Sequence, residues 1–446
     1  MKIAFLPIDN RPVCYTLPEM IAKIDSGIEF FIPERELLGG LTKTADIEGL
    51  FKWLVDLPEL DAIVLSLDTI AYGGLIPSRR CPETFEQIRE RVKKLKQILL
   101  TKNCKIYAFS SIMRISNNNY NVEEKEYWKK WGKKLFDYSY HTHKCGCESC
   151  ISNRIPSEIL DDYLETRKRN FKINKIYLQW QKEGLFETLV FSKDDCARYG
   201  FNVQEAQFLE SLGGFIKTGA DEIPLTLLAR AITGDMKVCP IFLEPEGKNL
   251  ISNYEDVSVE QSVLGQLDLA GINVGTEQET DIILYVNNFI ESQGEIVMKE
   301  DTESFSGKFN TPDTPYMIAD VRFANGADNN FIDELFKNEI DENFYGYSGW
   351  NTTANSLGSL ICAAKVKFFA KKYNPEAFEN LQAVRFLDDW AYQANVRQIL
   401  DSPDVERLMS GMENYEKIVG LVLNRKISAK YSYPWERLFE VEVELN

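Results

Sequence analysis

The chain has 446 residues, of which 44% are hydrophobic and 27% charged, and its formal net charge is −17. This length allows a large core and exceeds one minimal domain. Such an acidic surface repels nucleic acid and anionic lipid, because binding to phosphates depends on Lys and Arg. We therefore expect neither nucleic acid nor membrane as a partner.

Short apolar segments rich in β-branched and aromatic residues recur along the chain, as is typical of buried parallel strands. We predict strands at residues 3–7, 29–32, 62–67, 105–110, 188–191, 215–218, 238–243, 282–286, 317–319 and 344–347. Amphipathic or charged helical segments are predicted between them, at residues 84–100, 157–182, 203–212, 224–232, 259–269 and 331–338.

This alternation predicts an α/β protein with a parallel sheet covered by helices. About eight such units favour a (β/α)8-like barrel of mainly parallel strands; a doubly wound open sheet is the alternative. We expect a barrel-like catalytic domain at residues 1–356, with a polar insertion after the fourth strand at 117–154. Residues 357–446 are expected to form a mainly helical C-terminal region.

The start of the chain and its cysteines predict a cytoplasmic protein. Residues 3–7 are too short for the apolar part of a signal peptide, and no apolar run reaches the roughly 20 residues of a membrane span. The nine cysteines are mostly isolated, which indicates reduced thiols.

The chain has only two histidines, His141 and His143. A Ser-His-Asp triad or a zinc site with histidines from separate strands is therefore excluded elsewhere in the chain. Carboxylates become the natural candidates for acid/base chemistry.

Residues capable of chemistry follow most of the predicted strands, where parallel α/β folds place their active sites. We predict that they line one pocket for a small-molecule or carbohydrate substrate. The substrate-binding candidates at these strand ends are Asp9, Arg11, Asp68, Tyr72, Arg79, Arg114, Asp221 and Asn288. The alternative is that strands end in turns, which favour Asp, Asn and Gly.

Asp194 and Asp195 are the predicted catalytic residues. They follow the fifth predicted strand, where both side chains can turn toward one ligand. Two crowded carboxylates cannot both ionise easily, so one gains a raised pKa and can act as a general acid. The alternative is that one of them caps the next helix.

Trp350 and Asn351 are further candidates for substrate binding. An indole can stack on the apolar face of a sugar, and an amide can bond its hydroxyls. The alternative is a buried tryptophan beside a helix cap at Asn351 or Thr352.

The insertion contains a cluster of histidines and cysteines that could hold a structural zinc ion. Its candidate ligands are His141, His143, Cys145, Cys147 and Cys150. The separated C-x2-C pairs of common zinc sites are missing, and a catalytic metal is not expected here.

These segments together resemble a bacterial family known only as domain of unknown function 4127. The matching segments are residues 6–13, 67–68, 72–75, 78–79, 194–195, 199–200, 219–222, 228–230 and 349–352. The resemblance covers most of the chain, does not include the Cys/His cluster, and implies no particular reaction.

Asp194–Asp195 and Trp350–Asn351 are also similar, in order and chemistry, to hexosaminidases of the O-GlcNAcase type. That resemblance implies that Asp194 orients the acetamido group of the substrate and that Asp195 is the general acid/base.

The leading hypothesis is therefore a hydrolase of an amino-sugar glycosidic bond that requires no cofactor. One alternative is a metal-dependent hydrolase of a small anionic molecule, with Mg²⁺ or Mn²⁺ held by Asp9, Asp68 and Asp194. Another is a non-catalytic protein that binds a small ligand.

Overall fold

The structure, a computed structural model, describes residues 1–147, 152 and 154–446. The chain forms two compact units, each assembled from segments that are distant in sequence. The first unit comprises Met1–Asn10, Glu29–Pro224 and Tyr254–Asp256. The second unit comprises Arg11–Ile28, Leu225–Asn253 and Val257–Asn446.

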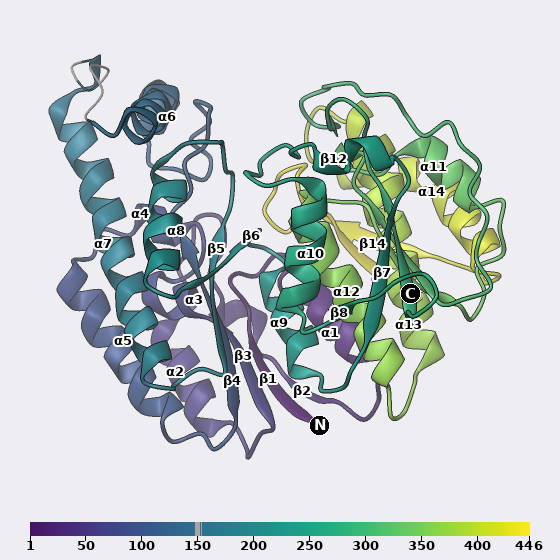
Figure 1. The fold of residues 1–446 in the computed structure, drawn as a ribbon, viewed down its shortest axis with the longest axis horizontal. Helices are drawn as coiled ribbons and strands as arrows, with labels where there is room; N and C mark the ends of the chain where they lie inside the picture. Colours follow the sequence, from purple (N-terminus) through teal and green to yellow (C-terminus); the bar gives the residue numbers. More distant parts are fainter. Residues whose placement is uncertain (148–151, 153) are drawn as a thin grey trace. The chain divides into compact units, whose positions relative to one another are not determined.

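The first unit is built on a parallel sheet of six strands in the order β2-β1-β3-β4-β5-β6 (Figure 1). The strands are β1 (Lys2–Leu6), β2 (Glu29–Phe31), β3 (Ala62–Ser66), β4 (Lys105–Ile112), β5 (Thr188–Lys193) and β6 (Phe215–Thr218). Every residue of β3 is buried, in keeping with the apolar run at residues 62–65. The strand order reverses between β1 and β3, so this is a doubly wound sheet.

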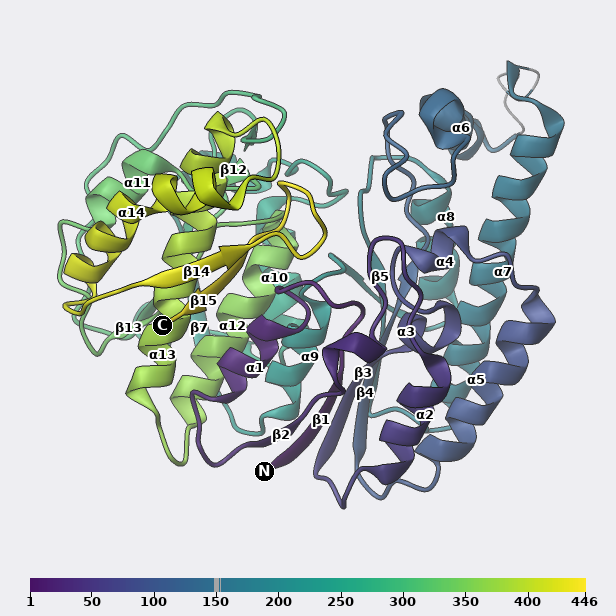
Figure 2. The ribbon, with the colours of Figure 1, turned by 180° about the vertical axis from the view of Figure 1, so that it is seen from behind.

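The helices of the first unit follow its strands. They are α2 (Ile47–Asp56), α3 (Leu67–Tyr72), α4 (Pro77–Arg80), α5 (Phe85–Leu99), α6 (Trp128–Cys145), α7 (Ser157–Lys182) and α8 (Phe201–Ser211). Helix α5 begins with a capping box, in which Thr84 and Gln87 each bond the other's backbone N–H. Helices α2, α5 and α7 lie side by side (Figures 1 and 2).

The second unit is built on a parallel sheet of five strands in the order β13-β11-β9-β7-β8. The strands are β7 (Lys237–Phe242), β8 (Asn273–Val274), β9 (Ile282–Asn287), β11 (Tyr316–Asp320) and β13 (Phe344–Ser348). Numbered along the chain, these strands have the order 2-1-3-4-5, which is also the order of the first five strands of the other sheet. The two units thus share one doubly wound strand order.

Helices and two small strand pairs complete the second unit. The helices are α1 (Thr16–Ala22), α10 (Val259–Leu269), α11 (Asn329–Leu335), α12 (Thr353–Phe369), α13 (Pro375–Arg385), a π-helix (Phe386–Asn395) and α14 (Val405–Val422). The strand pairs are β10 (Gly294–Glu295) with β12 (Phe323–Ala324), and β14 (Ala429–Ser432) with β15 (Glu442–Leu445). Helix α9 (Ile223–Ala231) begins where the chain leaves the first unit. In the described parts of the chain, no helix combines the length and apolar character that crossing a membrane requires.

The structure confirms the predicted α/β fold with parallel sheets, but not the closed (β/α)8-like barrel. The strands form separate sheets of six and five. A barrel and two consecutive doubly wound sheets have the same alternation of strands and helices along the sequence. This alternation does not show between which strands the hydrogen bonding of a sheet ends.

The expected boundary near residue 356 does not coincide with the division of the chain. Residues 357–446 belong to the second unit, in which α12 packs on β11 and β13, and α13 packs on β13. The expected insertion at 117–154 belongs to the first unit and includes the whole of α6. The apolar side of α6, with Leu135 and Phe136, joins a buried cluster that also includes Leu160 of α7.

Candidate functional site

The candidate site lies after strands β3, β4, β5 and β6 of the first unit. Each of these strands is followed by charged residues that the sequence singled out. They are Arg79 after β3, Arg114 after β4, Asp194 and Asp195 after β5, and Asp221 after β6. Neighbouring parallel strands end at the same edge of a sheet, which is where such sheets bind their ligands.

Asp194 and Asp195 follow directly on β5 and meet at one guanidinium group. Asp195 has a φ of 46°, a left-handed conformation that interrupts the alternation of side chains along the strand. Asp194 Oδ2 and Asp195 Oδ2 lie 3.6 and 3.0 Å from the same atom, Arg114 Nη1. Helix capping does not explain the pair, because the next helix, α8, has Gly200 at its N-cap.

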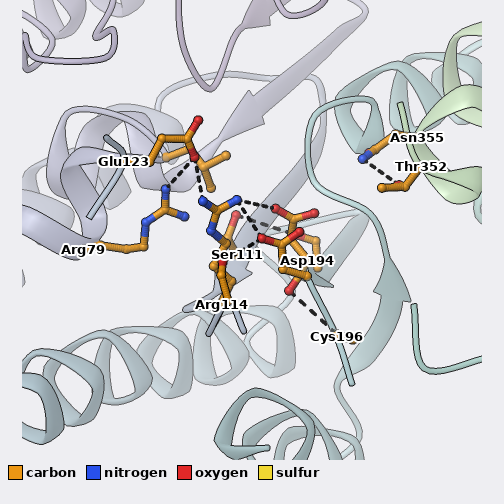
Figure 3. Close-up of polar contacts among 12 residues, drawn as sticks. Arg79, Ser111, Arg114, Glu123, Asp194, Cys196, Thr352 and Asn355 are labelled. Carbon is orange, nitrogen blue, oxygen red and sulfur yellow. Dashed lines mark hydrogen bonds and ion pairs between the residues drawn. The ribbon is translucent and has the colours of Figure 1, made fainter. Parts of the chain in front are cut away.

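Arg114 is the centre of the cluster. Its Nη2 lies 2.6 Å from Glu123 Oε2, and its Nε lies 3.4 Å from Glu124 Oε1. Figure 3 shows Arg114 between Glu123 and Asp194. The side chain of Arg114 is 17% exposed, so these four carboxylate contacts form in a largely desolvated place.

Glu123 and Glu124 are site residues that the sequence analysis missed. Both come from the predicted insertion, and they link Arg114 to Arg79, whose Nη2 and Nε lie 3.3 and 3.1 Å from Glu123 and Glu124. Arg79 is only 2% exposed and needs such partners. The acidic segment 123–126, soon after the end of β4, was the signal available in the sequence.

The two aspartates have different electrostatic environments. Burial, and then the negative charge of Asp195, raises the pKa of Asp194 to about 7; Arg114 acts in the opposite direction, and Asp221 adds to the increase. Asp195 accepts a hydrogen bond of 2.8 Å from Ser116 Oγ and has the shorter contact with the guanidinium. The pair therefore offers one carboxyl that holds a proton near neutral pH and one carboxylate that is stabilised by a cation.

Asp68 and Tyr72 of α3 are buried, and neither is among the residues that contact Arg114 in the described part of the chain. Asp68 accepts hydrogen bonds from Ser110 Oγ (2.9 Å) and from the backbone N–H of Ser111 (2.7 Å), and burial raises its pKa to about 6. Among the described residues, Tyr72 Oη is buried and has no hydrogen-bond partner. Asp9 is also buried, with 2% of its surface exposed. All three candidates lie in the first unit.

The other four candidates belong to the second unit. They are Arg11, Asn288, Trp350 and Asn351. The side chain of Asn288 is fully buried, and it accepts from the N–H of Glu244 and donates to its carbonyl oxygen. The side-chain amide of Asn288 thus joins the segments that follow β7 and β9. This structural role explains why an asparagine stands at this position.

Asn351 is also engaged within the fold. It has a φ of 78°, and its Oδ1 accepts from the N–H of Thr352 (2.8 Å) and from Asn355 Nδ2 (3.2 Å). Asn355 Nδ2 also donates to Thr352 Oγ1 at 3.1 Å (Figure 3). Asn351 thus organises the start of α12, while the adjacent Trp350 is 3% exposed.

The predicted zinc ligands are only partly described. His141 and His143 lie on α6, two residues and thus about 200° apart on the helix. Cys145 and Cys147 are exposed, and Cys150 lies outside the described residues. Among the residues that the structure describes, no three His, Cys, Asp or Glu side chains are grouped to hold a metal ion. A structural zinc stays a prediction.

Polar residues at the ends of β9 and β11 form a second buried network. Arg322 donates to Asn287 Oδ1 (3.0 Å) and to Glu244 Oε1 (2.7 Å), and its Nε lies 3.3 Å from Asp328. Asn287 Nδ2 donates to Asp320 at 2.8 Å. These contacts hold the strand ends of the second unit together.

Residues 3–444 match the family described as "Protein of unknown function (DUF4127)", and the chain belongs to this family. No curated protein and no solved structure matches the chain.

Proposed function

We propose that this member of the DUF4127 family hydrolyses the glycosidic bond of an amino-sugar substrate by acid/base catalysis at Asp194 and Asp195. One observation carries the proposal. Two adjacent carboxyl groups lie within 3.6 Å of one guanidinium nitrogen, yet their surroundings differ: burial raises the pKa of Asp194 to about 7, whereas Asp195 has the shorter ion pair and a hydrogen bond from Ser116. Hydrolases that act through two carboxyl groups need this separation of acid and base roles.

Asp194 is the general acid in this proposal. Its raised pKa of about 7 means that a large fraction of the enzyme carries the proton at neutral pH. Its side chain is 16% exposed, which leaves it accessible to a substrate. The same group, once ionised, can accept a proton from water in the second step.

Asp195 is the partner carboxylate in this proposal. The guanidinium of Arg114 and the hydroxyl of Ser116 both stabilise its negative charge. An ionised carboxylate can accept a hydrogen bond from the N–H of a substrate acetamido group. These roles are the reverse of those implied by the resemblance to O-GlcNAcase-type enzymes, and the difference in environment is the reason for the reversal.

In the first step, the acetamido oxygen attacks the anomeric carbon while the bond to the leaving oxygen breaks. Asp194 gives its proton to that oxygen, and Asp195 attracts the positive charge that develops on the acetamido nitrogen. In the second step, water attacks the anomeric carbon, the bond between that carbon and the acetamido oxygen breaks, and Asp194 takes back a proton from the attacking water. The reaction thus balances with water as the only co-reactant.

The charge of the site bears on the alternative of an anionic substrate. Among the described residues, four carboxyl groups contact the two guanidinium groups of Arg79 and Arg114, so these cations are already paired, which disfavours an anion as a further partner. The four are Glu123, Glu124, Asp194 and Asp195. Asp68, a candidate magnesium ligand, already accepts two hydrogen bonds.

The test is a panel of chromogenic glycosides assayed with the full chain, with and without EDTA. We expect cleavage of N-acetylhexosaminides and a loss of more than about 100-fold in rate for Asp194→Asn, as for other general acids. Asp56→Asn, at an exposed position of α2, is the matched control. EDTA-sensitive cleavage would support the metal-dependent alternative. Ligand-induced stabilisation without turnover would support a binding protein.

A further inference from the structure

Arg80, the last residue of α4, binds backbone carbonyl oxygens with all three nitrogens of its guanidinium group. Its Nε lies 3.0 Å from the carbonyl oxygen of Glu124, and its Nη2 donates to those of Asn121 (3.2 Å) and Val122. Its Nη1 lies 3.0 Å from the carbonyl oxygen of Leu41. All four acceptors are main-chain atoms, so Arg80 fixes the path of the backbone.

Three of these carbonyl oxygens belong to one turn at residues 121–124. The N–H of Glu124 donates to the carbonyl oxygen of Asn121 at 3.1 Å, which closes the turn. A guanidinium group presents five N–H donors in fixed directions within a plane, so it can bond several carbonyl oxygens at once. The ammonium group of a lysine is a single point charge and lacks this fork of donors. The arrangement around the turn therefore suits an arginine.

The turn carries the two glutamates that contact the arginines of the proposed site. Glu123 Oε2 lies 2.6 Å from Arg114 Nη2 and 3.3 Å from Arg79 Nη2, as Figure 3 shows. Glu124 Oε1 lies 3.4 and 3.1 Å from the Nε atoms of the same two arginines. Arg114 in turn contacts both aspartates of the site. Arg80 thus fixes the backbone from which both glutamates reach the cluster.

The loop that contains the turn has little apolar packing near its tip. Tyr120 and Val122 are 69% and 55% exposed. The loop begins after Ser116, whose hydroxyl donates to Asp195 at 2.8 Å. A segment with few buried apolar contacts has low local stability unless polar bonds hold it. We therefore expect the order of this loop to depend on the bonds from Arg80.

We propose that Arg80 is a positioning residue of the catalytic site. By holding the turn at 121–124, it keeps Glu123 and Glu124 on Arg114, and so keeps Arg114 against the two aspartates. This inference rests on the proposed function, because it gives Arg80 a part in that chemistry. Arg80 acts through the turn and not on the substrate. A small displacement of a catalytic group lowers a rate strongly, so a loosened turn should be visible in the rate.

Hydrogen exchange of the full chain, measured by mass spectrometry, tests the structural step without a substrate. In Arg80→Ala the turn loses three hydrogen bonds, so amides in residues 117–126 should exchange at least about 10-fold faster than in the wild type. Arg80→Lys keeps the charge without the fork of donors and should exchange at an intermediate rate. Arg89→Ala, at an exposed position of α5, is the matched control and should leave this segment unchanged.

The catalytic step is measured as kcat/KM on an N-acetylhexosaminide. Arg80→Ala should lose about 10- to 100-fold, as expected for a displaced catalytic group. Guanidinium chloride at about 50 mM, far below the concentrations on the order of 1 M that unfold proteins, should restore part of this loss by bonding the same carbonyl oxygens. Equimolar sodium chloride should not. Because Arg80 acts through Glu124, the losses of Arg80→Ala and Glu124→Gln should not add in the double variant.

The outcomes separate this inference from the proposed function. Unchanged exchange in Arg80→Ala, full rate despite faster exchange, additive losses in the double variant, or no recovery specific to guanidinium would each overturn the role of Arg80. Arg80→Lys carries the same tests should Arg80→Ala fail to fold. If the wild-type chain cleaves no glycoside, the proposed function fails, and the exchange of residues 117–126 still decides whether Arg80 holds the turn.

Discussion

Replacing Asp194 with asparagine should stabilise the protein in a pH-dependent way. In the folded chain, burial and Asp195 hold the pKa of Asp194 near 7, against 3.8 for an ordinary aspartate. Between these two pH values the folded chain retains a proton that the unfolded chain releases, so the contribution of this group to stability falls as pH rises. Asparagine has a similar shape and does not titrate, so the variant avoids this loss.

The size of the effect follows from the shift. At about 1.4 kcal/mol per pKa unit, a change from 3.8 to about 7 sets an upper limit of about 4 kcal/mol. The side chain is 16% exposed, and solvent lowers the cost of its charge, so we expect about 2 to 3 kcal/mol. The gain should be near zero at pH 4, grow as pH rises and level off above pH 7.

Urea unfolding followed by tryptophan fluorescence measures this gain at several pH values. Asp56→Asn serves as the control, because Asp56 is exposed at the end of α2. A gain in stability at the cost of activity is the pattern expected when a catalytic group is held in an unfavourable environment. The reasoning is refuted if Asp194→Asn is no more stable than the wild type at pH 8, or if its gain does not change between pH 5 and pH 8.

Four further substitutions test other parts of the structure. Arg114→Met removes the cation that lowers the pKa of Asp194, so the alkaline limb of the kcat/KM profile should move to higher pH while the rate falls; an unmoved limb would contradict this role. Gly73→Ala should destabilise the chain by more than about 1 kcal/mol, because φ is 91° and the new Cβ would lie 2.9 Å from the Cβ of a threonine. Gly184→Ala has a similar φ of 81° but open space around it, so it should cost less when thermal melts of the two variants are compared; equal losses would argue against the clash. Arg167→Met should cost about 3 to 5 kcal/mol in urea unfolding, because the 3%-exposed arginine lies 2.8 Å from a largely buried glutamate on α8; a loss below about 1 kcal/mol would show that this pair does not stabilise the fold.

Much of the secondary structure could be predicted from local patterns. The predicted helix at 157–182 coincides with α7, and the predicted strand at 62–67 is one residue longer than β3. The alternation of apolar and polar residues is a local property, so a single sequence reports it well. The separation into two sheets depends on hydrogen bonds between distant strands, and no local pattern records where that pairing ends.

The candidate site could be predicted in part. Strand ends identified Arg79, Arg114 and the aspartate pair, because parallel strands place their following loops at one edge. Glu123 and Glu124 were missed because they lie in an insertion whose path depends on the packing of α6. The assignment of acid and partner depends on burial and on the distances to Arg114, and neither is visible in the sequence.

The most direct test of the proposed chemistry compares leaving groups. An aryl N-acetylhexosaminide with a very acidic phenol as leaving group needs little help from a general acid, whereas an alkyl glycoside needs a full proton. If Asp194 is the acid, Asp194→Asn should lose more than about 100-fold in kcat/KM on the alkyl glycoside and much less on the activated aryl glycoside. Asp195→Asn should lose activity on both. Equal losses on the two substrates in Asp194→Asn, or the absence of turnover by the wild-type chain, would contradict the account.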